Sequence, residues 1–181
     1  MKTTGTLIAA FGRQYEVRTD DTGEILLCVP RGKKSLFACG DRVQIAATGP
    51  GQGVIDKLLE RSSLLYRSDA WRQKLIAANA TQVVLVVATE PSFSDEFLSR
   101  CICAAESQHL KVLIVLNKID IVAGLEGARA QLATFAKLGY PILELSALDS
   151  ADALRARLIG ETSLLVGQSG MGKSTLTNAL I

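Results

Sequence analysis

The sequence predicts two domains, a small all-β barrel of about 65 residues followed by an α/β domain built on a mostly parallel sheet. Three observations indicate this fold class. Short apolar segments alternate with turn residues up to about position 65, longer apolar runs alternate with helical patterns after position 80, and a glycine-rich loop occurs near position 170. With 48% hydrophobic residues among 181, the chain can bury a core in each domain.

Five short strands and no convincing helix are predicted for the N-terminal domain, residues 1–65. Turn-forming sequences at 20–23 and 49–51 separate some of these strands. The arrangement favours a five-stranded OB-fold barrel, a class whose face and loops often bind oligonucleotides. The predicted strands cover residues 6–10, 14–19, 24–29, 41–46 and 53–59.

One basic loop in the predicted barrel is a candidate contact for RNA. Arg31, Lys33 and Lys34 lie close together in the sequence, although an ordinary solvated loop explains them equally well. The net charge is only +2, so no strongly basic face indicates nucleic acid. Residues 66–80 are predicted to be a linker, in which Trp71 anchors the segment to a neighbouring domain and binds no ligand.

Strands and helices alternate in the C-terminal domain, residues 81–181, as expected for a parallel sheet with helices on its faces. Continuous apolar runs indicate strands that are covered on both faces. The predicted strands cover residues 83–88, 112–116, 141–145 and 163–166. The predicted helices cover residues 94–108, 124–138 and 150–159, with Asp149 or Ser150 as the cap of the third.

The most specific motif is a phosphate-binding loop. Residues 167–175 fit G-x-x-x-x-G-K-[ST] between a predicted strand and a helical pattern. Glycines let backbone N–H groups approach phosphate oxygens, and the start of the following helix attracts the anion. Lys173 can reach the terminal phosphates, and the Ser174 hydroxyl can complete the ligand shell of a Mg²⁺ ion. The predicted binding residues here are Gly167, Gln168, Ser169, Gly170, Met171, Gly172, Lys173, Ser174 and Thr175.

A second motif predicts which base is bound. Asn117, Lys118, Ile119 and Asp120 fit N-K-x-D directly after a predicted strand, at the edge where α/β sheets bind ligands. The Asp120 carboxylate can accept hydrogen bonds from N1–H and the N2 amino group of guanine, whereas adenine offers no such pair of donors. Asn117 can tie neighbouring loops together, and the stem of Lys118 can cover the base. Four residues alone could also form an ordinary polar loop.

Ser146 and Ala147 follow the next predicted strand, and together with the two motifs they make the sequence resemble the TRAFAC-type GTPases. In those proteins N-K-x-D and a Ser-Ala element hold guanine. The order differs here, because the base-binding motifs precede the phosphate loop, which indicates a circular permutation. The barrel, together with residues 40–43 and 90–94, makes the chain resemble one family, the ribosome small-subunit-dependent GTPases (RsgA/YjeQ).

This resemblance implies hydrolysis of GTP in late maturation of the small (30S) ribosomal subunit, with the barrel on 16S ribosomal RNA. It also implies GTP or GDP with Mg²⁺, a monomer and a cytoplasmic location. No membrane role is expected, because the apolar runs fall short of the ~20 residues that span a bilayer. Two alternatives stay open: a non-catalytic RNA-binding module with a guanine-nucleotide sensor site, and a different circularly permuted ribosome-assembly GTPase.

The resemblance further implies parts that these residues do not contain: a switch region, a D-x-x-G element and a C-terminal zinc domain. The chain is therefore expected to be truncated at its C-terminus, without zinc ligands or a water-positioning residue, so that Lys173 could stabilise charge but no turnover would follow. By analogy with Ras-like sheets, the expected strand order is 163–166, 83–88, 112–116, 142–145, with the first strand at an open edge.

Overall fold

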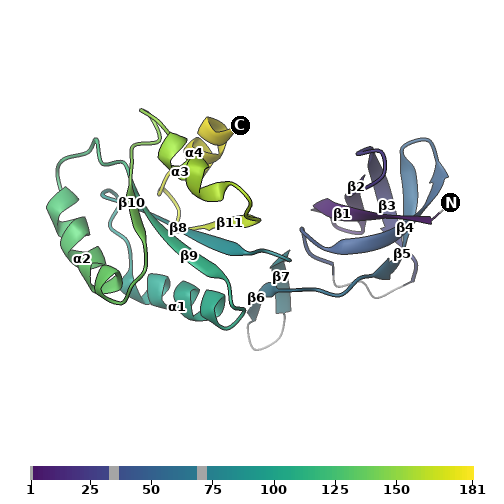
Figure 1. Ribbon diagram of the computed structural model, residues 1–181, viewed down its shortest axis with the longest axis horizontal. Coiled ribbons are helices and arrows are strands. Elements are labelled where there is room, and N and C mark those ends of the chain that lie inside the picture. The colour runs from purple at the N-terminus through teal and green to yellow at the C-terminus, as the bar shows by residue number, and fades with distance from the viewer. Residues whose placement is uncertain (1, 33–36, 69–72) are drawn as a thin grey trace. The chain divides into compact units, whose positions relative to one another are not determined.

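The computed structural model describes residues 2–32, 37–68 and 73–181 (Figure 1). The chain divides into two compact units, Met1–Ala80 and Thr81–Ile181. Lys33, Lys34 and Trp71, which the sequence analysis singles out, lie outside the described residues.

The first unit contains a closed five-stranded barrel, so the predicted OB-like barrel is confirmed. The strands follow one another around it in the order β1-β2-β3-β5-β4, and β4 pairs with β1 to close it. Neighbouring strands are antiparallel except for β3 and β5, which are parallel. The strands are β1 (Lys2–Phe11), β2 (Gln14–Thr19), β3 (Ile25–Pro30), β4 (Arg42–Gly49) and β5 (Gln52–Leu58).

Alternate residues of the barrel strands face inward, as the period of two in a pleated strand requires. Their side chains form one buried core, and each large apolar side chain buried there contributes about 1.5–3 kcal/mol. The core consists of Leu7, Tyr15, Val17, Leu26, Cys28, Val43, Ile45 and Ile55.

A buried ion pair fastens the segment that leads into β4. The Asp41 side chain is fully buried and accepts hydrogen bonds from Nε of Arg61 at 2.6 Å and from Nη2 of Arg61 at 2.7 Å. The same carboxylate accepts the N–H of Ala38 at 2.8 Å. Donating these hydrogen bonds to Asp41 raises the pKa of the Arg61 guanidinium above its usual value. A buried carboxylate with several partners is costly to disturb, because removing one partner leaves a buried charge unpaired.

A β-hairpin occupies much of the segment for which the sequence predicts a linker. Strands β6 (Leu64–Ser68) and β7 (Gln73–Ala78) pair in antiparallel fashion within the first unit. Ala78 donates its N–H to the carbonyl of Cys39, and Gly40 is a glycine because a Cβ there would lie 2.1 Å from the Ala78 carbonyl oxygen. The polar residues between the two short apolar segments mask this pairing in the sequence, since only Leu65 and Ala78 are buried hydrophobic residues of these strands.

The second unit is built on a four-stranded parallel sheet in the order β10-β9-β8-β11. This order confirms the one expected from the sequence, and within the described chain β11 pairs only with β8. All seven residues of β8 are buried, as its continuous apolar run predicts. The strands are β8 (Gln82–Ala88), β9 (Lys111–Asn117), β10 (Ile142–Glu144) and β11 (Ser163–Val166).

Helices cover both faces of this sheet: Figure 1 shows α1 and α2 on one face and α3 and α4 on the other. Helix α1 begins where the Ser94 hydroxyl accepts the N–H of Phe97, and it ends before β9. Helix α3 begins later than predicted, at Asp152, whose N–H is bound by the Ser150 hydroxyl. The helices are α1 (Asp95–Glu106), α2 (Leu125–Lys137), α3 (Asp152–Leu158) and α4 (Lys173–Leu180). None of the helices in the described ranges is both long and apolar enough to cross a membrane.

Replacement of the buried carboxylate should destabilise the barrel. In Asp41→Ala the Arg61 guanidinium and the Ala38 N–H lose their shared acceptor, and we expect the free energy of unfolding of the first unit to fall by about 3 kcal/mol. Urea denaturation followed by far-UV circular dichroism measures this loss. The control Glu24→Gln, at an exposed carboxylate of the same unit, should unfold as the parent does. Equal unfolding midpoints for both variants would contradict the assignment.

Candidate nucleotide site

Four loops meet at the carboxyl edge of the parallel sheet. Because β8, β9, β10 and β11 all run in the same direction, the segments that follow them leave the sheet at one edge. The predicted phosphate loop follows β11, the N-K-x-D motif spans the end of β9, and Ser146 comes directly after Leu145 beyond β10. Motifs that lie far apart in the sequence are thereby brought together.

The phosphate loop connects β11 to α4, which begins at Lys173. Two of its glycines are required for different reasons. A Cβ at Gly167 would lie 2.3 Å from the carbonyl oxygen of Val86, so the loop could not pack against β8. Gly172 has φ +86°, a left-handed conformation that favours glycine, and a Cβ there would lie 2.4 Å from Nδ2 of Asn117. The loop therefore packs tightly against the sheet and against the N-K-x-D segment.

The ammonium group of Lys173 lies within the phosphate loop itself. Its Nζ donates hydrogen bonds to the carbonyl oxygens of Gly167 at 2.8 Å and Gln168 at 2.7 Å. A phosphate group would compete with these carbonyls for the same donor. Met171, also among the predicted binding residues, is 1% exposed, so it is buried beneath the loop.

One side chain joins the three predicted motifs. Asn117 is 1% exposed at the end of β9, and its Nδ2 donates to the carbonyl oxygen of Met171 at 3.0 Å. Its Oδ1 accepts the N–H of Ala147, also at 3.0 Å. Asn117 therefore bonds to the phosphate loop with one end of its amide and to the Ser-Ala loop with the other. Both ends of the amide are satisfied, which fixes its orientation.

A cavity of about 290 Å³ opens beside this asparagine. That volume is close to the lower end of the range for small-molecule sites, ~300–1,000 Å³. The N-K-x-D segment, the Ser-Ala loop and the phosphate loop all contribute to its wall. The lining residues are Asn117, Lys118, Asp120, Ile121, Ser146, Ala147, Leu148, Gly172 and Thr175.

Two oxygen groups in the cavity wall have no partner in the part of the chain that the structure describes. The carboxylate of Asp120 is exposed and makes no hydrogen bond or ion pair there. The hydroxyl oxygen of Ser146 is buried and also lacks a hydrogen-bond partner. A buried polar atom without a partner costs free energy, so a ligand edge that offers hydrogen-bond donors or acceptors would be stabilised here.

Sequence reasoning missed two apolar residues of the cavity, Ile121 and Leu148. Each directly follows a predicted motif, which was the available signal. Leu148 is 79% exposed although it is a large hydrophobic residue. Conversely, Ile119 was predicted as a binding residue from its place in the motif but does not line the cavity. Of the phosphate loop and the start of α4, only Gly172 and Thr175 line it, so most of the predicted phosphate-binding residues lie outside this cavity.

The predicted Mg²⁺ ligand, Ser174, is exposed in the first turn of α4. Across residues 2–32, 37–68 and 73–181, no group of three or more His, Cys, Asp or Glu side chains is placed to hold a metal ion. One hydroxyl beside a phosphate loop fits an ion that takes most of its ligands from phosphate oxygens and water, as Mg²⁺ does. The residues present therefore fit Mg²⁺ as a companion of the nucleotide.

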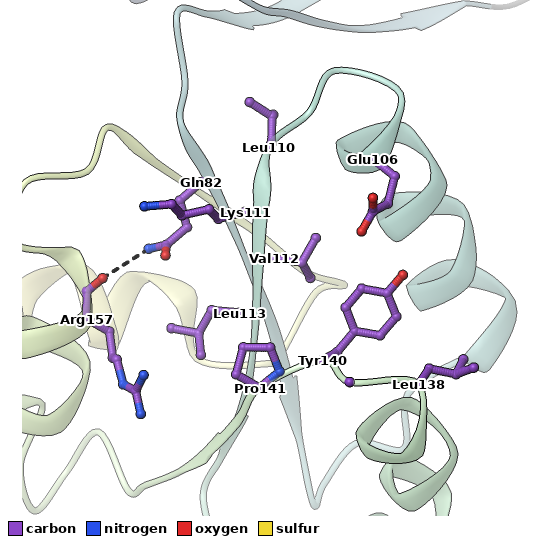
Figure 2. Close-up of a pocket in the computed structure, with 11 residues that line it drawn as sticks. Gln82, Glu106, Leu110, Lys111, Val112, Leu113, Leu138, Tyr140, Pro141 and Arg157 are labelled. Atoms are coloured by element: carbon purple, nitrogen blue, oxygen red, sulfur yellow. Dashed lines mark hydrogen bonds between the residues drawn. The ribbon is translucent and has the colours of Figure 1, made fainter.

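A larger cavity, of about 520 Å³, lies at the opposite, amino edge of the sheet (Figure 2). Glu106 and Tyr140 lie on one side of β9 in this view and Arg157 on the other, with Nε2 of Gln82 donating to the Arg157 carbonyl at 3.3 Å. Helices α1, α2 and α3 end near this cavity, and their C-terminal ends carry negative partial charge. The charged residues in its wall are Glu106, Lys111 and Arg157, and none of the predicted site residues lines this cavity.

The predicted basic loop of the barrel is described only at Arg31. Its Nε lies 2.9 Å from Oδ1 of Asp56, and the side chain is 71% exposed. Asp56 also pairs with Nζ of Lys2 at 3.4 Å, so one carboxylate offsets part of two positive charges. The Asp56 side chain is only 10% exposed, whereas the Arg31 guanidinium stays accessible.

Comparison with known proteins identifies the family. A family model described as RsgA GTPase matches residues 58–181. A protein of Nitrosospira multiformis is 54% identical over 177 residues, which cover 98% of this chain and 56% of the relative. A protein of Burkholderia pseudomallei is 52% identical over 181 residues, covering 98% of this chain and 58% of the relative. Both are named small ribosomal subunit biogenesis GTPase RsgA, and the chain spans little more than half of their length.

Solved structures show the same fold. YjeQ from Thermotoga maritima matches with a TM-score of 0.79 and 31% identity, over 99% of this chain and 65% of that one. YloQ, described as a circularly permuted GTPase, matches with a TM-score of 0.73 and 26% identity, over 99% and 64%. These matches agree with the order of motifs along the sequence, and with the family model they show that the chain belongs to the RsgA GTPase family.

Proposed function

We propose that this chain binds GTP and GDP at the carboxyl edge of its sheet, as part of a GTPase that acts in maturation of the small ribosomal subunit. The observation that carries the proposal is the pair of hydrogen bonds by which the Asn117 side chain joins the phosphate loop to the Ser-Ala loop. Asn117 and Asp120 line the same cavity. The names of the relatives supply the ribosomal context.

Guanine would be selected at the end of the cavity formed by Asp120 and Ser146. The free carboxylate of Asp120 can accept both N1–H and the N2 amino group, and the unpartnered Ser146 hydroxyl can donate to a base acceptor. Adenine would leave the carboxylate without donors, and unpaired acceptors are what make such sites selective. The stem of Lys118 lines the same cavity and can cover the base.

The phosphates would extend from this cavity along residues 167–172 toward the start of α4. Backbone N–H groups and the helix N-terminus attract the anion, and Lys173 would exchange its loop carbonyls for phosphate oxygens. Mg²⁺, held by the Ser174 hydroxyl and phosphate oxygens, would supply positive charge as the phosphoryl group leaves. In this proposal Lys173 stabilises the same developing charge.

The finer expectations belong to the same proposal. The barrel would contact 16S ribosomal RNA with its basic loop, in which Arg31 is the described residue and is exposed, and the protein would act as a cytoplasmic monomer. Zinc would be bound by ligands outside these 181 residues. Sedimentation with purified small subunits, in the presence and absence of a non-hydrolysable GTP analogue, tests the ribosomal part, and absence of co-sedimentation in both states would exclude it.

Replacement of the base selector should change which base is preferred. In Asp120→Asn an amide donor faces the N2 amino group of guanine, so we expect GDP affinity to fall about 10- to 100-fold, as for loss of a charge-assisted hydrogen bond. Xanthosine diphosphate, which has a carbonyl in place of that amino group, should gain affinity. Isothermal titration with both nucleotides and with ADP measures the change, and Asp149→Asn is the matched control. A variant that prefers GDP over ADP as strongly as the parent would refute the assignment.

The exposed leucine of the cavity should contribute to binding of the base. We expect Leu148→Ser to lower affinity for guanosine, GDP and GTP by the same factor, about fivefold, because a purine ring would cover this otherwise exposed side chain. Ile159, 80% exposed against 79% for Leu148, lies outside the cavity, so Ile159→Ser is the control. Competition with a fluorescent GDP analogue provides the measurement. Equal affinities for the two variants would mean that the base does not contact Leu148.

Removal of Lys173 should weaken the binding of the phosphates and leave the binding of the base unchanged. We expect Lys173→Ala to lower GDP and GTP affinity about 10- to 100-fold, because a charge-assisted contact to phosphate is lost. Affinity for guanosine, which has no phosphate, should stay within about twofold. The control is Lys137→Ala, at the exposed end of α2. A parallel loss for guanosine would indicate that the variant disturbs the base cavity and not the phosphate contact.

A further inference from the structure

The loop between β8 and α1, residues 89–94, contacts both halves of the candidate site. At its start, Thr89 and Glu90 each make a hydrogen bond to Lys118 of the N-K-x-D segment. At its end, Ser94 donates its N–H to Oε1 of Gln168 in the phosphate loop at 3.1 Å. No sequence motif marks this loop as part of a nucleotide site.

Lys118 needs outside support for its conformation. Its φ is +61°, a left-handed value that is unfavourable for a residue with a Cβ and persists only where neighbouring groups hold it. Two neighbours do so. Oγ1 of Thr89 donates to the Lys118 carbonyl oxygen at 2.9 Å, and Nζ of Lys118 donates to the Glu90 carbonyl oxygen, also at 2.9 Å. The backbone and the side chain of Lys118 are therefore fastened to consecutive residues of one loop.

The Thr89 hydrogen bond controls the direction of the chain toward the base selector. The Lys118 carbonyl belongs to the peptide unit that joins Lys118 to Ile119, so its orientation sets the course of the backbone on the way to Asp120. On the other side, the N–H of Thr89 lies 3.4 Å from the Asn117 carbonyl oxygen. Thr89 thus bonds to the backbone on both sides of the strained residue, between Asn117 and Asp120, which both line the cavity.

We propose that Thr89 is a positioning residue for guanine recognition, acting through Lys118; this rests on the proposed function. Thr89 does not line the cavity, so its hydroxyl cannot contact a bound base there. Its side chain is partly buried, and loss of the hydroxyl would leave the Lys118 carbonyl without this donor. The left-handed conformation would then be held less firmly, and Asp120 would be presented to the base less often in the productive orientation.

The other end of the loop, residues 91–94, contacts the phosphate loop, whereas its start contacts Lys118. The Gln168 bond and the close approach of Pro91, whose Cγ would lie 3.2 Å from a Cβ on Gly170, connect residues 91–94 to the phosphate loop. A general loosening of residues 89–94 would therefore weaken the binding of every nucleotide that carries phosphates, whatever its base. A specific effect of Thr89 on Lys118 would lower the affinity for guanine nucleotides and leave the affinity for adenine nucleotides unchanged.

The test compares Thr89→Val, which keeps the shape but removes the donor, with Thr89→Ser, which keeps the hydroxyl. Isothermal titration of the full chain with GDP and ADP in Mg²⁺ should give a loss of about fivefold for GDP in Thr89→Val, the typical effect of one neutral hydrogen bond. ADP affinity should not change, so the preference for guanine falls by the same factor. Thr89→Ser should stay within about twofold of the parent.

Controls separate the possible failures. Thr134→Val makes the same replacement at an exposed site on α2 and should bind as the parent does. If melting shows that Thr89→Val is unfolded, Thr89→Ala removes the same donor and should show the same loss of preference. A parent chain without guanine preference would refute the proposed function. If the parent prefers guanine and Thr89→Val retains that preference, this inference alone is overturned. The same holds if Thr89→Val lowers the affinities for GDP and ADP by the same factor.

Discussion

The amide of Asn117 is the contact on which the candidate site depends. It lies buried at the end of β9, and each end of the amide bonds to a different loop, so the phosphate loop and the Ser-Ala loop take their positions from one side chain. Because an amide has a donor end and an acceptor end, only one orientation satisfies both partners. Gly172 shows how closely these parts pack, since any Cβ there would lie 2.4 Å from the same amide nitrogen.

The direction of the sheet explains why the candidate nucleotide site is assigned to one edge and not to the other. At the carboxyl edge a glycine loop and the start of α4 present N–H groups, which suit an anion. At the amino edge α1, α2 and α3 end, and a larger cavity there faces the negative ends of helices. The larger cavity also has Lys111 and Arg157 in its wall, so the case for the carboxyl edge depends on its glycine loop and the start of α4 and not on cavity size.

Local patterns predicted the elements and the motifs, but of the contacts between them only the one that Asn117 makes to neighbouring loops. The run at 83–88 is a fully buried strand, and the strand order expected by analogy with Ras-like sheets is the observed one. The hairpin at β6 and β7 did not follow from the sequence, because its short strands have few buried apolar residues and depend on pairing with Cys39 and Gly40. Leu148, as a wall of the cavity, and Thr89, as the support of Lys118, lie outside any motif and required coordinates.

Circular permutation also changes when the site can form. The residues that would select the base are joined to the phosphate loop by contacts across 54 positions, from Asn117 to Met171, and β11 pairs with β8 across about 80 positions. Such long-range pairing is slow to form, because closing a long loop costs entropy before the contacts it makes can compensate. The predicted base-binding loops therefore precede the phosphate loop in the chain, and the phosphate loop packs against them only after this long-range pairing. The docking of β11 on β8 brings Gly172 to Asn117, so this strand pairing and closure of the cavity wall depend on the same contacts.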